Sequence, residues 1–256
     1  MELIPVDEKR EIVIAETKKD ASLFLSIRFA HFARISILEH NFFTCAIPGG
    51  SSPTDFFETI TTSSIGEHIE WDKVKIFFTD ERAVPFDHKE SNYGAAAPYF
   101  TKEPFNKVQF FPMHAYKEDL AKECKEYEKV IQKECCNGLL DLVILGIGAD
   151  GHTASLFPFS TVLHNESCLT APAVNPHTGS KRMTLTFKAI NESKKIAALA
   201  FGKEKAEMIH QVFSQNEDED KYPAKTLGKG NSSVIFILDQ KASKSLANAH
   251  PQHNEE

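Results

Sequence analysis

Five short apolar runs recur along the chain, and each ends at residues that favour a turn. The runs are Phe42 to Ile47, Val74 to Phe78, Leu142 to Leu145, Ile196 to Phe201 and Val234 to Leu238. Apolar runs of this length, bounded by turn residues, predict strands that are buried on both faces. Helical patterns lie between the runs. The sequence therefore predicts an α/β fold with a doubly wound, mostly parallel sheet and helices on both faces.

Two weaker segments bring the expected number of strands to about seven. Residues 108–111 could form a short strand, and residues 182–187 alternate between polar and apolar side chains. Residues 160–180 are rich in Pro, Asn, His and Thr and are expected to be irregular. Because no repeat or linker divides the 256 residues, we expect one domain over residues 1–256, with a polar tail from about residue 248.

The limits of the predicted helices come from capping residues and from apolar positions at helical spacing. Asp20 is expected to cap a helix that runs to about His40. Its apolar positions near one face are Leu23, Phe24, Ile27, Ile35 and Leu38. Further helices are expected over residues 55–60, from Ser91 to about Phe100, and over residues 119–135, 204–213 and 240–247.

Charge and composition narrow the classes of partner. The formal net charge of −7 makes nucleic acid and anionic membranes poor partners. The five cysteines form no CxxC pair, and no two histidines have metal spacing, so neither a disulfide framework nor a metal site is indicated. Charges stand where a signal peptide would need its apolar core, and no stretch approaches the ~18 continuous apolar residues of a membrane span. We expect a cytoplasmic protein.

An acid and an imidazole stand two residues apart in a glycine-rich turn after the run that ends at Leu145. This turn would place Asp150 and His152 at the carboxyl end of a strand, where ligands bind in open α/β sheets. His152 could then act as a general base that Asp150 orients. Residues 153–156 could start a helix, so the alternative is a helix cap at Asp150 beside a surface histidine.

The first strand leads into the loop PGGSSP at residues 48–53. Gly49 and Gly50 would let the backbone turn sharply and approach a ligand closely. Ser52 is a good helix cap, and Pro53 suits the first helical position. The loop, with Ser51, would direct free N–H groups and the positive end of a helix dipole at one anion. An ordinary strand-to-helix loop is the alternative.

Charged side chains follow the strand predicted over residues 74–78. Arg82 could grip a phosphate or carboxylate with its planar guanidinium, and Asp80 and Glu81 could orient it or bind substrate hydroxyls. A salt bridge in a solvated loop is the alternative. Lys205 falls in the first turn of a predicted helix, where a cation opposes the helix dipole, so it could be held for an anion.

Three stretches together resemble the 6-phosphogluconolactonase family, which belongs to a larger group with the glucosamine-6-phosphate deaminases/isomerases. They are PGGSSP at 48–53, TDERAVP with SN at 79–92, and LGIGADGHTASLFP at 145–158. The segment DGHTASLFP is the most specific, and the resemblance runs over nearly the whole chain. It implies a Rossmann-like α/β fold, no cofactor, and hydrolysis of 6-phospho-D-glucono-1,5-lactone to 6-phospho-D-gluconate, the second step of the oxidative pentose phosphate pathway.

The resemblance also implies a role for individual residues. His152 would be the catalytic base, with Asp150 beside it. The substrate and its phosphate would be bound by Gly49, Gly50, Ser51, Asp80, Arg82, Arg182 and Lys205. The match is loosest for Arg182 and Lys205, and Lys203 could replace Lys205. The family usually has Ser before the two glycines, where this chain has Pro48.

In the expected mechanism, His152 deprotonates water, the water attacks C1, and His152 then protonates the departing ring oxygen. Backbone N–H groups of the glycine turn or Arg82 would meet the oxyanion. The expected partner is a sugar phosphate lactone, and the expected state is a monomer or weak homodimer.

Two other functions stay open at this point. A glucosamine-6-phosphate deaminase usually carries Asp-Glu-Tyr where this chain has Arg82, and Phe-Asn-Glu-Pro where it has Leu156-Phe157-Pro158. A non-catalytic sugar-phosphate sensor could dispense with the base, and the intact pair Asp150 and His152 argues against it.

Overall fold

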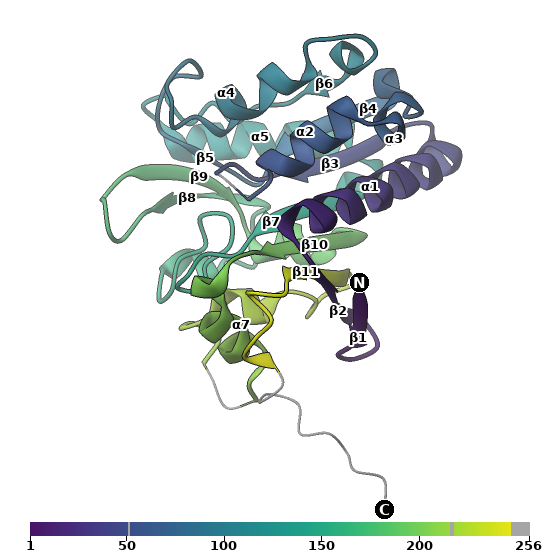
Figure 1. Ribbon diagram of the computed structural model, residues 1–256. Helices are drawn as coiled ribbons and strands as arrows, with labels where there is room; N and C mark the ends of the chain where they lie inside the picture. Colours follow the sequence, from purple (N-terminus) through teal and green to yellow (C-terminus); the bar gives the residue numbers. More distant parts are fainter. Residues whose placement is uncertain (51, 216–217, 247–256) are drawn as a thin grey trace, which may run out of the picture.

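The computed structural model describes residues 1–50, 52–215 and 218–246. An eight-stranded sheet runs through the molecule in the order β1-β2-β11-β10-β7-β3-β4-β6 (Figure 1). Its strands are β1 Glu2–Pro5, β2 Arg10–Ala15, β3 Phe43–Ile47, β4 Val74–Phe78, β6 Gln109–Phe110, β7 Leu142–Gly146, β10 Lys195–Ala200 and β11 Ser233–Asp239. β1 pairs antiparallel with β2, and the remaining neighbours are parallel. The predicted α/β fold with a mostly parallel sheet is confirmed.

Helices cover both faces of the sheet. In Figure 1, α1 and α2 lie in front of the strands and α5 lies behind them. The helices are α1 Lys18–His40, α2 Thr54–Thr62, α3 Ser64–Glu67, α4 Asn92–Ala96, α5 Leu120–Glu134, α6 Phe187–Glu192 and α7 Ala206–Phe213. All five residues of β3 are buried as a result, which is why this strand reads as an unbroken apolar run.

The direction of winding changes between β3 and β7. From β3 the chain continues to β4 and β6 on one side, whereas β7 continues to β10 and β11 on the other. β3 and β7 are hydrogen-bonded neighbours, with Cys45 opposite Leu142. Because the two strands are parallel, the loops that follow them leave the same edge and diverge. A crevice at such a switch point is the usual ligand site of an open α/β sheet.

A second sheet of three antiparallel strands has the order β5-β9-β8. Its strands are β5 Asp80–Arg82, β9 Lys181–Leu185 and β8 Thr170–Val174. Thr79 connects it to the main sheet, because its N–H donates to Ile47 O and its carbonyl accepts from Leu185 N. The sequence predicted β9 but not its sheet, predicted a loop for β5, and wrongly predicted irregular chain over β8. Pro172 lies within β8 and weakens the strand pattern.

The predicted core face of α1 is wrong. Leu23, Ile27, Ile35 and Leu38 are between 41% and 73% exposed, and Phe24 is only partly buried. The buried face instead combines Leu25 and Phe29 with small residues such as Ala21, Ser22 and Ser26. Ser26 Oγ donates to Ser22 O at 2.8 Å, so the buried hydroxyl costs little. Because α1 is apolar nearly all round, the spacing of apolar residues could not identify the buried side.

Several predicted helix limits also need correction. Thr17 caps α1, and Asp20 completes a capping box as its third residue. Pro53 takes the cap position of α2 in place of Ser52, without a side-chain hydrogen bond. Residues 153–156 form a turn between two isolated β-bridge positions, Thr153 and Leu156, and no helix.

Residues 240–245 form turns instead of the predicted helix, while Ala247 and the tail from residue 248 lie outside the described residues. The N-terminal strands β1 and β2 were not predicted. The helices predicted near residues 55–60, 91–100, 119–135 and 204–213 are confirmed, with Ser91 and Asp119 as caps.

The core is rich in phenylalanine, and the five cysteines are free thiols. Phe29 of α1 packs against Phe43 of β3, Phe56 of α2 and Trp71. α1 is the one helix in the described part of the chain that is long and apolar enough to cross a membrane by length and composition, and 44% of its apolar window is buried in the fold. Core helices pass the same test.

Candidate active site

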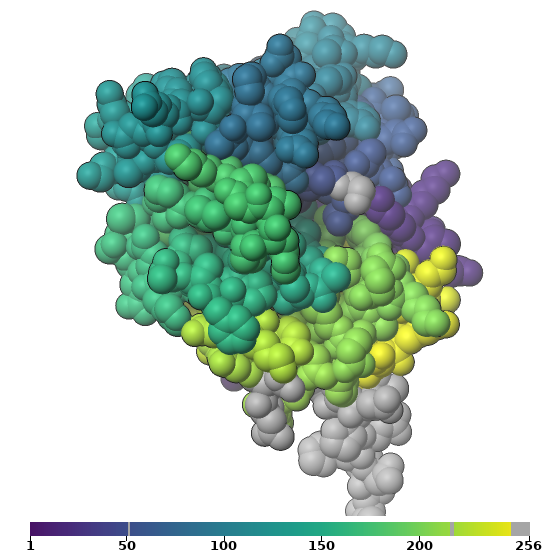
Figure 2. Space-filling view, turned by 90° about the vertical axis from the view of Figure 1, so that its left-hand side faces the viewer, coloured from purple at the N-terminus to yellow at the C-terminus, as the bar shows by residue number. Residues whose placement is uncertain are grey.

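A cavity of about 320 Å³ opens at the carboxyl ends of β3 and β7. Figure 2 faces this side, where the green β8–β9 segment, the lime-green segment after β10 and the indigo loop after β3 border a hollow. Of the residues predicted for the site, those that line the cavity are Gly49, Gly50, Asp80, Arg82, His152, Arg182 and Lys205. Asp150 lies directly behind His152. Ser51 falls outside the described residues.

The turn after β7 fixes His152 against Asp150. Gly148 N–H donates to His152 O at 2.8 Å, which closes the turn. His152 Nδ1 lies 2.5 Å from Asp150 Oδ1, and the backbone N–H of His152 donates to the same oxygen at 3.2 Å. The imidazole is 31% exposed and packs against Phe157, with ring centroids 4.8 Å apart. With Nδ1 bound to the carboxylate, Nε2 is the nitrogen left for proton transfer.

The carboxyl of Asp150 is held in its ionised form. Partial burial raises its pKa, but the hydrogen bond and the charge of His152 outweigh this and bring the pKa to about 2. The negative charge of the Asp150 carboxylate beside Nδ1 stabilises the imidazolium that forms when the ring accepts a proton. This is the arrangement that orients a histidine base.

Two arginines lie opposite each other on paired strands of the second sheet. Arg82 in β5 is the register partner of Arg182 in β9, and both line the cavity. Burial and the charge of Arg82 lower the pKa of Arg182. Arg82 donates to Glu90 O, and Arg182 donates to Ser180 Oγ at 3.2 Å. Within the described residues neither guanidinium forms an ion pair, although the charges of Asp80, Glu81 and Glu90 act on Arg182 from a distance and offset part of the lowering of its pKa.

Lys205, just before α7, adds a third cation to the lining of the cavity. Burial lowers the pKa of Lys205 below its ordinary value, and the charges of Glu204 and Asp150 offset only part of that shift. Lys203 is not among the lining residues. Of the two lysines that the sequence left open, Lys205 is the one that lines the cavity, and its contact with a phosphate stays a prediction.

Glu81 organises the segment that carries Arg82. Its carboxylate is fully buried and accepts backbone N–H groups from Arg82, Asn92 and Tyr93 at 2.7–2.9 Å, and the Ser91 hydroxyl at 3.0 Å. Burial raises the pKa of Glu81 above its ordinary value, and these hydrogen bonds offset only part of that shift. The sequence suggested that Glu81 could orient Arg82. In the structure, Glu81 accepts a hydrogen bond from the backbone N–H of Arg82 and makes none to its guanidinium.

Asp80 is buried and both of its carboxylate oxygens are engaged. Oδ1 accepts from Asn92 Nδ2 at 3.0 Å, and Oδ2 accepts from Ser155 Oγ at 2.7 Å. Asn92 also packs closely against the loop after β3: if Gly49 carried a Cβ, that atom would lie 1.7 Å from Asn92 Oδ1. Asp80 therefore ties together three segments that surround the cavity.

The loop after β3 approaches the cavity through its backbone. Gly50 has a φ of +79°, a conformation that glycine adopts at little cost. Pro48 and Ser52 also line the cavity, and α2 begins directly behind the loop. Its first N–H groups, uncapped by any side chain, belong to a helix end that favours an anion.

The sequence did not single out four residues that shape the site. Ser155 and Asn92 hold Asp80, while Phe157 and Asn175 line the cavity. Three of them lie inside the conspicuous motifs, so proximity in sequence could have found them. Asn175 comes from the loop between β8 and β9, and no local signal marks it.

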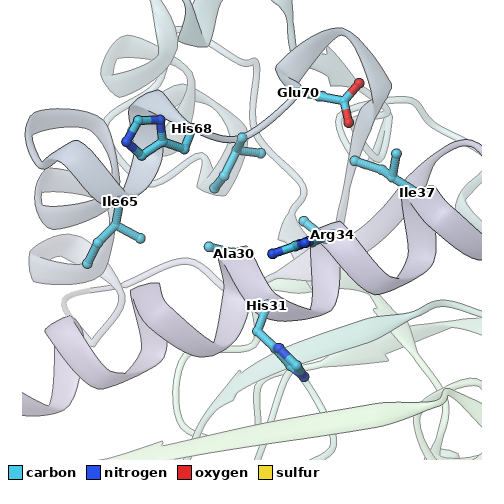
Figure 3. Close-up of a pocket in the computed structure, with 9 residues that line it drawn as sticks. Ala30, His31, Arg34, Ile37, Ile65, His68 and Glu70 are labelled. Atoms are coloured by element: carbon cyan, nitrogen blue, oxygen red, sulfur yellow. The ribbon is translucent and has the colours of Figure 1, made fainter.

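A second cavity, of about 470 Å³, lies between α1 and the segment from α3 to Glu70 (Figure 3). Figure 3 shows Arg34 on α1 opposite His68 and Glu70. None of the predicted site residues lines it. Among residues 1–50, 52–215 and 218–246, no group of three or more His, Cys, Asp or Glu side chains could hold a metal ion.

Comparison with known proteins shows the family and the fold to which the chain belongs. The model of the family described as glucosamine-6-phosphate isomerases/6-phosphogluconolactonase matches residues 16–236. A 6-phosphogluconolactonase of Chlamydia pneumoniae is 30% identical over 224 residues, which cover 86% of this chain and 85% of that protein. One of Haemophilus influenzae is 32% identical, over 78% and 86% of the two chains. The crystal structure of a 6-phosphogluconolactonase from Shewanella baltica shares the fold, with a TM-score of 0.81 and 22% identity over 91% and 99%.

Proposed function

Because the chain belongs to the glucosamine-6-phosphate isomerase/6-phosphogluconolactonase family, we propose that it hydrolyses 6-phospho-D-glucono-1,5-lactone to 6-phospho-D-gluconate. One observation carries the proposal. A histidine oriented by a carboxylate shares a cavity with three cations that form no ion pair within the described residues. A base beside an anion-binding wall is what an anionic ester substrate requires.

In this mechanism, His152 is the general base. Nδ1 is bound to Asp150, so Nε2 takes a proton from water as the water attacks C1 of the lactone. The tetrahedral intermediate collapses with cleavage of the bond between C1 and the ring oxygen. His152 returns its proton to that oxygen, which becomes the hydroxyl of the open-chain acid. Asp150 stays ionised throughout, since its pKa of about 2 lies far below neutral pH.

The phosphate and hydroxyl groups of the substrate are held by the remaining residues. Arg82, Arg182 and Lys205 supply the positive charge, and the Gly49–Gly50 backbone supplies N–H donors. Binding a remote phosphate fixes C1 relative to the base, which lowers the entropic cost of the reaction. The oxyanion is met by N–H groups of the glycine turn or by Arg82, and one such donor contributes roughly 3–4 kcal/mol to transition-state stabilisation.

The direct test is a lactonase assay in strongly buffered solution, corrected for spontaneous hydrolysis. We expect turnover of 6-phosphogluconolactone and no ammonia release from glucosamine-6-phosphate. Ammonia release without lactone hydrolysis would identify a deaminase instead. Tight binding of sugar phosphates with neither reaction would identify a sensor.

The assembly and location of the protein belong to the same proposal. We expect a single domain that acts in the cytoplasm as a monomer or weak homodimer, with no nucleic-acid or membrane partner. The negative net charge supports the last point. Sedimentation at several concentrations tests the oligomeric state.

A further inference from the structure

The carboxylate of Asp150 lies between two imidazoles, one near each oxygen. Oδ1 is bound to His152 Nδ1 at 2.5 Å, and Oδ2 lies 3.8 Å from His177 Nε2. His177 belongs to the loop between β8 and β9, far along the chain from the turn that carries Asp150. Asp150 is the one acidic partner of this ring among the described residues. The mechanism above gives His177 no role.

The loop around His177 is ordered by its own hydrogen bonds. Asn175 Oδ1 accepts the N–H groups of His177 at 2.9 Å and Thr178 at 3.1 Å, and Gly179 N–H donates to Asn175 O at 2.9 Å. The same loop lines the cavity through Asn175 and contacts Arg182 through Ser180. A compact turn therefore fixes the backbone of His177 beside the catalytic turn, although the ring itself is 75% exposed.

We propose that His177 is a positioning residue that shares Asp150 with His152 and tunes the proton affinity of His152. The inference rests on the proposed function, because it assigns His152 as the base. Protonated His177 attracts the carboxylate and repels a proton on His152. It therefore keeps His152 in the neutral, basic form at lower pH than Asp150 alone would allow.

Other charges face this group and stay the same in every variant below. Asp150 contacts both rings, and the charge of Lys205 interacts with Asp150. Asp80, Arg82, Arg182 and Lys205 line the cavity into which His152 projects. Because they are common to all variants, a change in the pH profile between variants reports the charge at position 177.

The size of the effect follows from the distance across one carboxylate. Two unit charges on either side of one carboxylate, in a partly solvated setting, shift each other's proton affinity by roughly two- to fourfold, or about 0.3–0.6 pH units. High salt reduces the shift, because the site is open to solvent.

The experiment compares His177→Gln, which is always neutral, with His177→Lys, which stays positive. The acid limb of kcat/KM should move to higher pH in the Gln variant and stay or move lower in the Lys variant. His164→Gln is the matched control, since His164 is an exposed histidine that pairs with Asp220 instead. A purely structural role would affect both His177 variants in the same direction.

An NMR titration of His152 in substrate-free, histidine-labelled protein separates this inference from the proposed function. Opposite shifts of the His152 titration in the two variants support the shared carboxylate even if no lactone is turned over, a result that would overturn only the proposed function. Normal turnover with identical His152 titrations in wild type, His177→Gln and His177→Lys would overturn the inference.

Discussion

The imidazole of His152 occupies the space beside the backbone of Gly148. A Cβ on residue 148 would lie 2.1 Å from His152 Nδ1 and 2.6 Å from Asp150 Oδ1. The contact between His152 and Asp150 therefore requires glycine at position 148, because any side chain there would displace the imidazole or the carboxylate.

We expect Gly148→Ala to lower kcat by at least about a hundredfold, since the added methyl group displaces the ring that acts as base. Circular dichroism and the melting temperature should show a folded protein. The control is Gly138→Ala, which meets only ordinary contacts at 3.8 Å but has a φ of +72°. It should lose about 1 kcal/mol of stability and keep its activity. Full activity in Gly148→Ala would mean that the ring need not sit against Asp150.

We expect His152→Ala to lower kcat by ~10²–10⁴-fold with little change in KM, because a general base acts on the transition state. Stopped-flow assays with 6-phosphogluconolactone would measure this, with subtraction of the spontaneous rate. His164→Ala serves as a control and should behave as wild type. A His152→Ala enzyme with near-normal turnover would remove His152 from the mechanism.

We expect Arg182→Ala to raise KM by about 10–100-fold and to change kcat less, since hydrogen bonds to charged groups contribute roughly 1.5–3 kcal/mol. Gluconolactone without a phosphate provides the comparison. If Arg182 binds the phosphate, wild type and variant should hydrolyse this substrate at similar rates. An equal loss on both substrates would place Arg182 at the reacting carbonyl instead.

We expect Glu81→Gln to destabilise the protein by about 2–4 kcal/mol, because a neutral amide offers one acceptor oxygen to donors that now use two. Urea unfolding would measure the change. KM should also rise, because the Glu81 carboxylate accepts the backbone N–H of Arg82 and so helps to position this substrate-binding residue. The exposed Glu58→Gln change is the control and should leave both quantities unaltered. An unchanged urea midpoint for Glu81→Gln would refute the role of the buried carboxylate.

Asp150 should contribute to stability in a pH-dependent way. The pKa of its carboxyl is lowered to about 2, below the value of about 3.9 expected in an unfolded chain. Its contribution is therefore complete above about pH 4 and is lost as the pH falls towards about 2. Asp150→Asn should melt below wild type at pH 7, and the gap should narrow between pH 4 and pH 2. A difference in melting temperature that does not depend on pH would show that the charge of Asp150 does not cause its stabilising effect.

Much of the fold was predictable, because strands that helices cover on both sides carry unbroken apolar runs. Apolar runs of this kind predicted β3, β4, β7, β10 and β11. The buried face of α1 was not predictable, because exposed Ile27 and buried Leu25 look alike in sequence and the serines that pack inward look polar. Only the tertiary structure decides which side meets the sheet.

Part of the site was likewise predictable from the sequence, and part depends on the tertiary structure. Asp150 and His152 are neighbours in sequence, so their pairing followed from the turn alone. The pairing of Arg82 with Arg182 depends on the second sheet, whose short strand β5 carries three charged residues and no strand pattern. The contact between His177 and Asp150 joins two loops from different sheets, and nothing local in the sequence records it.

The position of β11 has a consequence for how the chain can complete its fold. β11 lies between β10 and β2, so the first parallel strand of the chain gains its inner neighbour only from residues 233–239. Until those residues arrive, two strands present open edges that can pair with other molecules. A product shortened before Ser233 would still contain every residue assigned to catalysis, yet it would be prone to aggregate rather than to act.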